Sequence, residues 1–181
     1  MVLVSSKAVA PESPRLTMAD SLGPDLEQDI QLTLAFLNTR DPATAAGALD
    51  DQENWQRWCE EHALGEVPSV HAARGIRDSM RAAATCAASI DPAIAWNWPA
   101  QVTLRGGLPV LTGVDALSTV LAAATRLVTT AHWNRVKICP AHDCLVAFYD
   151  RSRNRSRTWC SMRICGNREK ARSWRERHAP A

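Results

Sequence analysis

The chain has 181 residues, 46% of them hydrophobic and 22% charged, a balance that excludes an intrinsically disordered protein. This length accommodates one domain, or one domain with a small appended module. The formal net charge of +2 hides a split, because residues 1–134 carry nine Lys/Arg and fifteen Asp/Glu whereas residues 135–181 carry twelve and four. A basic C-terminal part of this kind indicates an anionic partner, either nucleic acid or a membrane surface.

The first 24 residues are rich in Ser and Pro, and we expect them to form a flexible leader. They lack the sustained apolar stretch of a signal peptide, and no segment of the chain reaches the length of a transmembrane helix. We therefore expect a cytoplasmic protein without a membrane partner. Cytoplasmic thiols stay reduced, so paired cysteines in such a protein are more often metal ligands than disulfides.

Residues 25–134 are expected to form a multihelical domain. Apolar periodicity and capping residues predict one helix that ends near Asn38, a second from about Asp51 with Asp41 as an earlier cap, and two more within residues 68–91 and 114–133. Between the last two, residues 96–113 have alternating character around a Gly-Gly pair, which predicts a short β-hairpin.

Two isolated cysteines, Cys59 and Cys86, lie on predicted apolar helix faces and are expected to be buried, inert thiols. The adjacent Glu60, Glu61 and His62 have the residue types of an acid–base pair but no recognisable partner set. We interpret them as a solvated helix face, and we expect that the protein is not an enzyme.

The other four cysteines form two pairs with the same spacing, Cys139 with Cys144 and Cys160 with Cys165. Two short-range pairs on either side of a longer loop supply the four ligands of a tetrahedral zinc site. Four protein ligands leave no position for water, so we expect one structural Zn²⁺. A module of roughly 40 residues buries too little surface to fold alone, and metal binding supplies the missing free energy.

The spacing leaves one alternative ligand open, since His142 also lies at an acceptable distance along the chain from Cys139. Cys144 is favoured because it makes the two pairs symmetrical.

The loop between the cysteine pairs is strongly basic, with arginines at alternate positions: Arg151, Arg153, Arg155 and Arg157. An extended strand would project all four from one face, whereas a turn would spread them along a hairpin. Either arrangement builds a cationic ridge, and the guanidinium group suits bidentate contacts with phosphate or guanine.

A basic helix is predicted just after Cys165, with Arg168, Arg172 and Arg175 along one stripe and Lys170 nearby. Its first turn would direct free N–H groups and the positive end of the helix dipole at the thiolates, which offsets their negative charge. We expect both basic segments to contact nucleic acid.

Residues 133–178 resemble the zinc finger named after its Cys-Gly-Asn-Arg motif, here Cys165 to Arg168. The resemblance includes both Cys-x4-Cys pairs, the Asp-Arg-Ser-Arg-Asn-Arg-Ser segment and the Trp-Cys-Ser-Met segment that begins at Trp159. Residues 32–40, LTLAFLNTR, also resemble the ABATE domain, the helical domain usually found before this finger. The resemblance implies zinc on the four paired cysteines, a treble-clef-like finger of hairpin and helix, and a bacterial, stress-related transcription regulator.

Together these features predict a mainly α protein with a helical ABATE-like domain at 25–134 and a CGNR-type zinc finger at 135–178. In this hypothesis the helical domain senses a small-molecule effector or mediates homodimerisation, and the finger binds DNA. Two alternatives use the same basic face, one to bind RNA and the other to bind an acidic protein.

Overall fold

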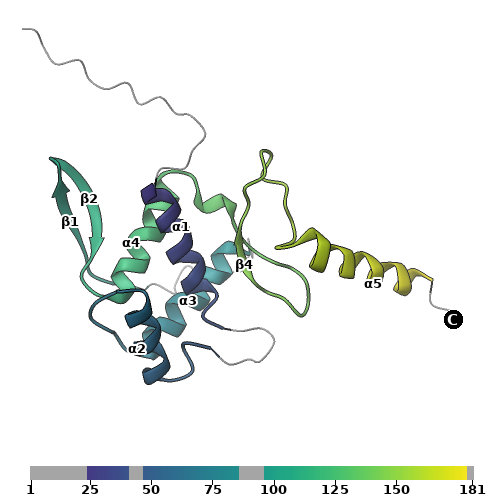
Figure 1. Cartoon of the computed structure of the whole chain (residues 1–181), viewed down its shortest axis with the longest axis horizontal. Helices are drawn as coiled ribbons and strands as arrows, with labels where there is room; N and C mark the ends of the chain where they lie inside the picture. Colours follow the sequence, from purple (N-terminus) through teal and green to yellow (C-terminus); the bar gives the residue numbers. More distant parts are fainter. Residues whose placement is uncertain (1–23, 41–46, 86–95, 179–181) are drawn as a thin grey trace, which may run out of the picture.

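The computed structural model describes residues 24–40, 47–85 and 96–178 (Figure 1). Within these ranges no helix is both long enough and apolar enough to cross a membrane. Residues 1–23 of the predicted leader, the expected cap at Asp41, and Cys86 lie outside the described residues. The elements follow in the order α1 (Pro24–Leu37), α2 (Gln52–Glu61), α3 (Val70–Ala84), β1 (Ala100–Arg105), β2 (Leu108–Gly113), α4 (Ala116–Thr129), the 3₁₀ turn η1 (Trp133–Arg135), β3 (Val136–Ile138), β4 (Ala147–Tyr149), the π-helical turn η2 (Met162–Gly166) and α5 (Asn167–Arg177).

The predicted helices of the N-terminal part are confirmed, and local side chains explain where they begin. Asp51, Ser69 and Asp115 each accept a hydrogen bond from a backbone N–H in the first turn of α2, α3 and α4. Helix α4 ends at Thr129 rather than near Trp133, because Ala131 adopts a left-handed φ of 59°. This turn directs the chain through η1 into β3.

The predicted hairpin is also confirmed, with β1 and β2 antiparallel and Arg105 opposite Leu108. Gly106 and Gly107 form its turn with φ values of 58° and 84°, a conformation that glycine adopts without strain. The hairpin lies at the opposite end of the molecule from α5 (Figure 1). Three of its aliphatic side chains are largely exposed: Val102, Leu104 and Leu108.

The larger core cluster is built around three aromatic rings, Phe36 of α1 and Trp55 and Trp58 of α2. The two tryptophan rings stack with centroids 5.2 Å apart, and the indole nitrogen of Trp55 donates to the Pro68 carbonyl at 2.9 Å. This contact lets a large amphipathic ring be buried with its N–H satisfied. Helices α3 and α4 complete the cluster with smaller side chains.

A second core cluster joins the helices to the β3–β4 sheet. Its buried members come from α1, α3, α4 and both strands: Ile30, Leu37, Ala84, Leu127, Val136, Ala147 and Tyr149. Next to it the Asn38 side chain donates to the carbonyl of Ala147 at 2.9 Å and accepts from its N–H at 2.7 Å. The β3–β4 hairpin, which carries the first cysteine pair, therefore shares a core with the helices and is not a separate module joined by a linker.

Helix α1 contains one buried polar atom without a hydrogen-bond partner in the described part of the chain, the hydroxyl oxygen of Thr33. A buried hydroxyl without a partner costs free energy, and valine has a similar shape and helix propensity. We expect Thr33→Val to raise the free energy of unfolding by about 1 kcal/mol, measured by urea denaturation. Thr119→Val should lower it instead, because the Thr119 hydroxyl donates to the Asp115 carbonyl at 2.7 Å.

Candidate metal centre

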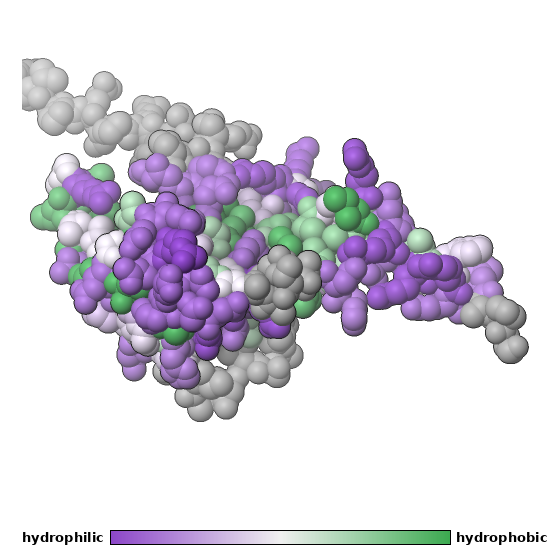
Figure 2. Space-filling view, turned by 60° about the horizontal axis from the view of Figure 1, so that its bottom comes forward, coloured by the Kyte–Doolittle hydropathy of each residue, from purple (hydrophilic) through white to green (hydrophobic). Residues whose placement is uncertain are grey.

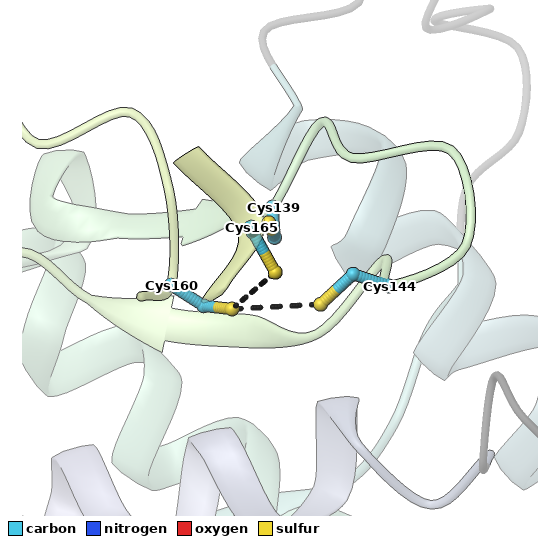
Figure 3. A group of neighbouring side chains, drawn as sticks. All are labelled: Cys139, Cys144, Cys160 and Cys165. Atoms are coloured by element: carbon cyan, nitrogen blue, oxygen red, sulfur yellow. Dashed lines mark hydrogen bonds between the residues drawn. The ribbon is translucent and has the colours of Figure 1, made fainter. Parts of the chain in front are cut away.

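The four paired cysteines converge on one point in the C-terminal part (Figure 3). Their sulfur atoms all lie within 4.8 Å of one another, with 3.4 Å between Cys144 and Cys160 and 3.6 Å between Cys160 and Cys165. Four sulfurs bound to one zinc ion at about 2.3 Å in a tetrahedron are about 3.8 Å apart. The arrangement therefore fits a four-coordinate metal ion.

A short loop after β3 supplies the first two sulfurs. The N–H of Cys139 donates to the Val146 carbonyl at 2.9 Å, and the N–H of Cys144 donates to the Ala141 carbonyl at 3.0 Å. Leu145 follows with a left-handed φ of 52°, which turns the chain back into β4. These bonds close the loop and turn both thiols inward.

The second pair lies where the chain enters the C-terminal helix. Helix α5 begins at Asn167, just after Cys165 as predicted, but a π-helical turn that was not predicted comes before it. The helical segment begins at Met162 in η2, before Cys165 and not after it. The Ser161 side chain caps this turn by accepting from the Ile164 N–H at 3.3 Å, so the chain becomes helical earlier. Cys165 therefore lies inside the first helical turn, and α5 continues from Asn167.

The glycine of the Cys-Gly-Asn-Arg motif has a packing role. A Cβ atom on Gly166 would lie 2.4 Å from the sulfur of Met162 and 3.0 Å from the ring of Trp159. Both side chains pack against the turn that holds Cys165. The φ of Gly166 is −62°, so close approach and not backbone freedom explains this glycine.

The environments of the thiols differ. Burial raises the pKa of Cys160 and Cys165, and hydrogen bonds with neighbouring cysteines add to the rise at Cys160. Burial acts in the same direction on Cys139, but hydrogen bonds with the backbone of Cys160 and Ala141 outweigh it and hold the pKa of Cys139 below its usual value. Several thiolates this close repel one another, so all four sulfurs can be deprotonated together only when a cation is bound among them.

The structure brings Cys144 into the group and leaves His142 out of it. Among the described residues the metal-ligating group contains the four cysteines alone, and His142 is exposed at the surface. Cys59 lies apart in α2, where burial, helped by the charge of Glu60, raises its pKa to about 12. It is the buried, neutral thiol that its helix face predicted.

Arg168, the last residue of the motif, connects the two cysteine pairs. Its guanidinium forms an ion pair with Asp143 at 2.6 Å and also lies 3.8 Å from the sulfur of Cys165. It places a positive charge beside a ligand sulfur and ties the first loop to the second. Outer contacts of this kind orient ligands and tune metal affinity.

Asp150, directly before the basic loop of residues 151–157, holds the two ends of this loop together, a role that the sequence pattern did not indicate. It is fully buried and accepts from Lys137 Nζ at 2.7 Å and from the N–H groups of Ser152 and Arg157, each at 2.9 Å. Burial alone would raise the pKa of Asp150, but these hydrogen bonds hold it well below its usual range. One carboxylate thus gathers both ends of the loop.

We expect Asp150→Asn to lower the free energy of unfolding by about 3 kcal/mol, because the charge of Lys137 would lose its buried partner. Glu27→Gln removes a more exposed ion pair, with Arg151, and should change it by no more than about 1 kcal/mol. Because the folded-state pKa of Asp150 is lowered, its contribution is present above the usual carboxyl pKa and is lost as pH falls through the lowered value. Urea denaturation of both variants at neutral pH measures the difference.

The loop confirms the turn rather than the extended strand, and its four arginines divide into two kinds. Arg151 pairs with Glu27 of α1 at 2.6 Å, and Arg157 donates to the carbonyls of Trp159 and Cys160, so both have partners inside the chain. Arg153 and Arg155 are exposed at the tip, where neither forms an ion pair with a described residue.

The arginines of α5 divide in the same way. Arg172 pairs with Glu169 at 2.6 Å, and Arg168 is held by Asp143. Lys170 and Arg175 are exposed and form no ion pair within the described ranges. Helix α5 continues directly from η2 and projects from the molecule with a hydrophilic surface (Figures 1 and 2). A helix that is polar on all sides owes little of its stability to a core.

Comparison with known proteins agrees with this geometry for the C-terminal part. No curated protein matches the chain. Residues 135–178 match the family model of the CGNR zinc finger, and the four cysteines in that segment are the ones that the fold brings together. The C-terminal part of this chain is therefore a zinc-finger module of the CGNR type, with four cysteines positioned to bind a metal ion.

Proposed function

We propose that the protein is a zinc-containing, DNA-binding transcription regulator. One observation carries the proposal: the metal centre lies at the base of both exposed basic segments. Cys160 follows the loop that presents Arg153 and Arg155, and Cys165 lies in the turn that begins the helix with Lys170 and Arg175. A metal held there fixes the spacing between two sets of cations, as an interface for a regular polyanion requires.

We assign one structural zinc ion to the four sulfurs. Thiolates are soft ligands, and four of them at tetrahedral spacing favour zinc over hard cations such as magnesium or calcium. With all four positions filled by protein, the ion organises the fold and does no catalysis. That the protein is not an enzyme is part of the proposal; in α2, His62 donates to the Trp58 carbonyl at 2.8 Å and stacks on the Trp58 ring, contacts within its own helix.

In the proposed complex the contacts to DNA come from those of the predicted contact residues that form no ion pair with described residues. Arg153 and Arg155 at the tip of the loop would contact phosphates, and α5 would place Lys170 and Arg175 at a groove. The other predicted contacts, Arg151, Arg157, Arg168 and Arg172, are also exposed, but their bonds within the chain hold them in place and stabilise the two basic segments.

DNA is favoured over RNA because the basic surface offers little aromatic area for stacking bases. Tyr149 is buried, Trp159 is half-buried, and Trp174 on α5 is exposed but stacks on His178 with centroids 4.6 Å apart. An acidic protein would be recognised by the same charges, so the experiment must include it as an outcome.

The test is a titration of the metal-loaded protein with random-sequence duplex DNA, single-stranded DNA and RNA in chloride buffers of different concentration. We expect duplex DNA to bind best, with an affinity that falls steeply as salt rises. Equal affinity for duplex and single strands, or a preference for RNA, would favour the RNA alternative. Indifference to all three would remove the regulator hypothesis in its direct form and leave an acidic protein as the partner.

The N-terminal part, as an ABATE-like domain, would receive an effector or mediate dimerisation. Dimerisation is supported by the exposed aliphatic side chains of the β1–β2 hairpin, far from α5 (Figure 1). A cytoplasmic regulator with a lone finger would bind weakly, and a homodimer would double the contacts. Sedimentation of wild type and of a Leu104→Lys variant measures whether this hairpin associates.

A further inference from the structure

A small cavity lies at the seam between the helices and the zinc finger. Its volume is about 210 Å³. One side is lined by basic residues of the helical part, Arg40 after α1 and Arg77 and Arg81 on α3. The opposite side is the loop that carries the first cysteine pair, and it contributes His142, Asp143 and Leu145. Both parts of the protein therefore build this one site.

The two carboxylates in the cavity wall already have partners. Asp78 pairs with the neighbouring Arg77 at 2.9 Å, and Asp143 pairs with Arg168 at 2.6 Å. Arg81 differs from Arg77 and Arg168, since no carboxylate in the described part of the chain forms an ion pair with it. Its positive charge is therefore not paired directly with a carboxylate, although Asp78 lies in the same cavity wall.

The position of Arg81 is set by neutral acceptors from both parts of the protein. Its guanidinium donates to the carbonyl of Leu37 at the end of α1 at 2.7 Å. It also donates to the carbonyl of Leu145, directly after the first cysteine pair, at 2.5 Å. Burial and the nearby charge of Arg77 lower the pKa of Arg81, and Arg40 acts in the same direction, while the charge of Asp78 opposes them only in part. Half-buried like charges around an open space are stabilised by an anion placed among them.

We propose that this cavity binds a small oxyanion, the phosphate or carboxylate group of a compact metabolite, with Arg81 and Arg40 as its principal ligands. Guanidinium groups form short, paired hydrogen bonds with such groups. The volume is below the roughly 300–1,000 Å³ of sites for drug-sized molecules, which excludes a nucleotide-sized ligand. Arg81 holds the anion while it also holds the Leu145 carbonyl, so occupancy tightens the seam between the helices and the metal loop.

The cavity would be the binding site for the effector of the proposed function, and a small oxyanion would be that effector. Its regulatory purpose rests on the proposed function, whereas anion binding can be measured without it. The experiment is a calorimetric titration of the full, metal-loaded chain with inorganic phosphate, and separately with acetate, at constant ionic strength set by sodium chloride. Thermal unfolding in the same buffers gives a second readout, because a ligand that binds the folded state raises Tm.

We expect saturable binding of one anion with a rise in Tm, and the stronger of the two probes identifies the chemistry as phosphate or carboxylate. Arg40→Gln and Arg81→Lys should each weaken binding about tenfold, the loss expected for one charge-assisted hydrogen bond. Arg153→Gln, which removes an equal charge from the exposed loop, should change it less than about twofold. Arg40 is exposed, so its variant is expected to keep the fold even if Arg81→Lys loosens the seam.

The proposal is overturned if neither anion binds saturably at constant ionic strength. It is equally overturned if Arg40→Gln binds as tightly as wild type, or if Arg153→Gln loses as much affinity as the cavity variants do. Failure here leaves the DNA titration intact, because that titration uses chloride buffers without phosphate. Failure of DNA binding likewise leaves the anion titration unaffected, since no nucleic acid is present in it.

Discussion

Replacing Cys160 by serine is expected to abolish binding of the metal ion and to unfold the chain beyond β4. The segment between Asp150 and α5 has few apolar side chains of its own, and its small core consists of the cysteines with Ala141, Phe148 and Trp159. Structural zinc in small modules contributes of order 10 kcal/mol at neutral pH, and nothing else in this segment replaces it. The strands β3 and β4 share the core of the helices, so we expect α1, α3 and α4 to stay folded.

Metal analysis and hydrogen exchange test this expectation together. The variant, and wild type after a chelator, should lose the bound ion and the amide protection of residues 151–177 while the helices keep theirs. Cys59→Ala is the matched control, since it removes a buried cysteine outside the group and should retain one equivalent of metal. Retention of a full equivalent in the Cys160 variant would show that the four sulfurs are not the ligands.

The second large effect is expected when the exposed cations are removed together. A variant with Arg153, Arg155, Lys170 and Arg175 all changed to glutamine should lose roughly two to three orders of magnitude in affinity for duplex DNA at low salt. The slope of log affinity against log salt should become shallower by about 3.6, or 0.9 for each lost phosphate contact. Fluorescence anisotropy at several chloride concentrations measures both quantities.

Double variants separate charge in general from charge at this surface. Arg153→Gln with Arg155→Gln should reduce the slope by about 2. Arg57→Gln with Arg105→Gln removes the same charge from exposed positions on α2 and β1 and should leave the slope unchanged. Equal effects of the two double variants would mean that DNA responds only to net charge, and the proposed interface would be wrong.

The sequence by itself determined the main helices, the β1–β2 hairpin and the four cysteines that are positioned to bind a metal ion. Helices and hairpin follow from apolar periodicity and from a Gly-Gly turn, both of which act over a few residues, although the cap of α2 is Asp51 and not the expected Asp41. The candidate ligands follow from the matched spacing of two cysteine pairs, and the structure brings Cys144 rather than His142 to the group. The helix after Cys165 was predicted as well, but the π-helical turn before it, which Ser161 caps, was not.

Only the tertiary structure decided which basic residues are free to meet a partner. Arg151 and Arg153 lie on either side of Ser152, yet Arg151 is held by Glu27, 124 residues away along the chain, whereas Arg153 forms no ion pair with a described residue. The buried role of Asp150 and the cavity at Arg81 likewise depend on segments that are distant in sequence. Local patterns encode bonds within one element, whereas the pairing of charges depends on distances that exist only once the elements have packed.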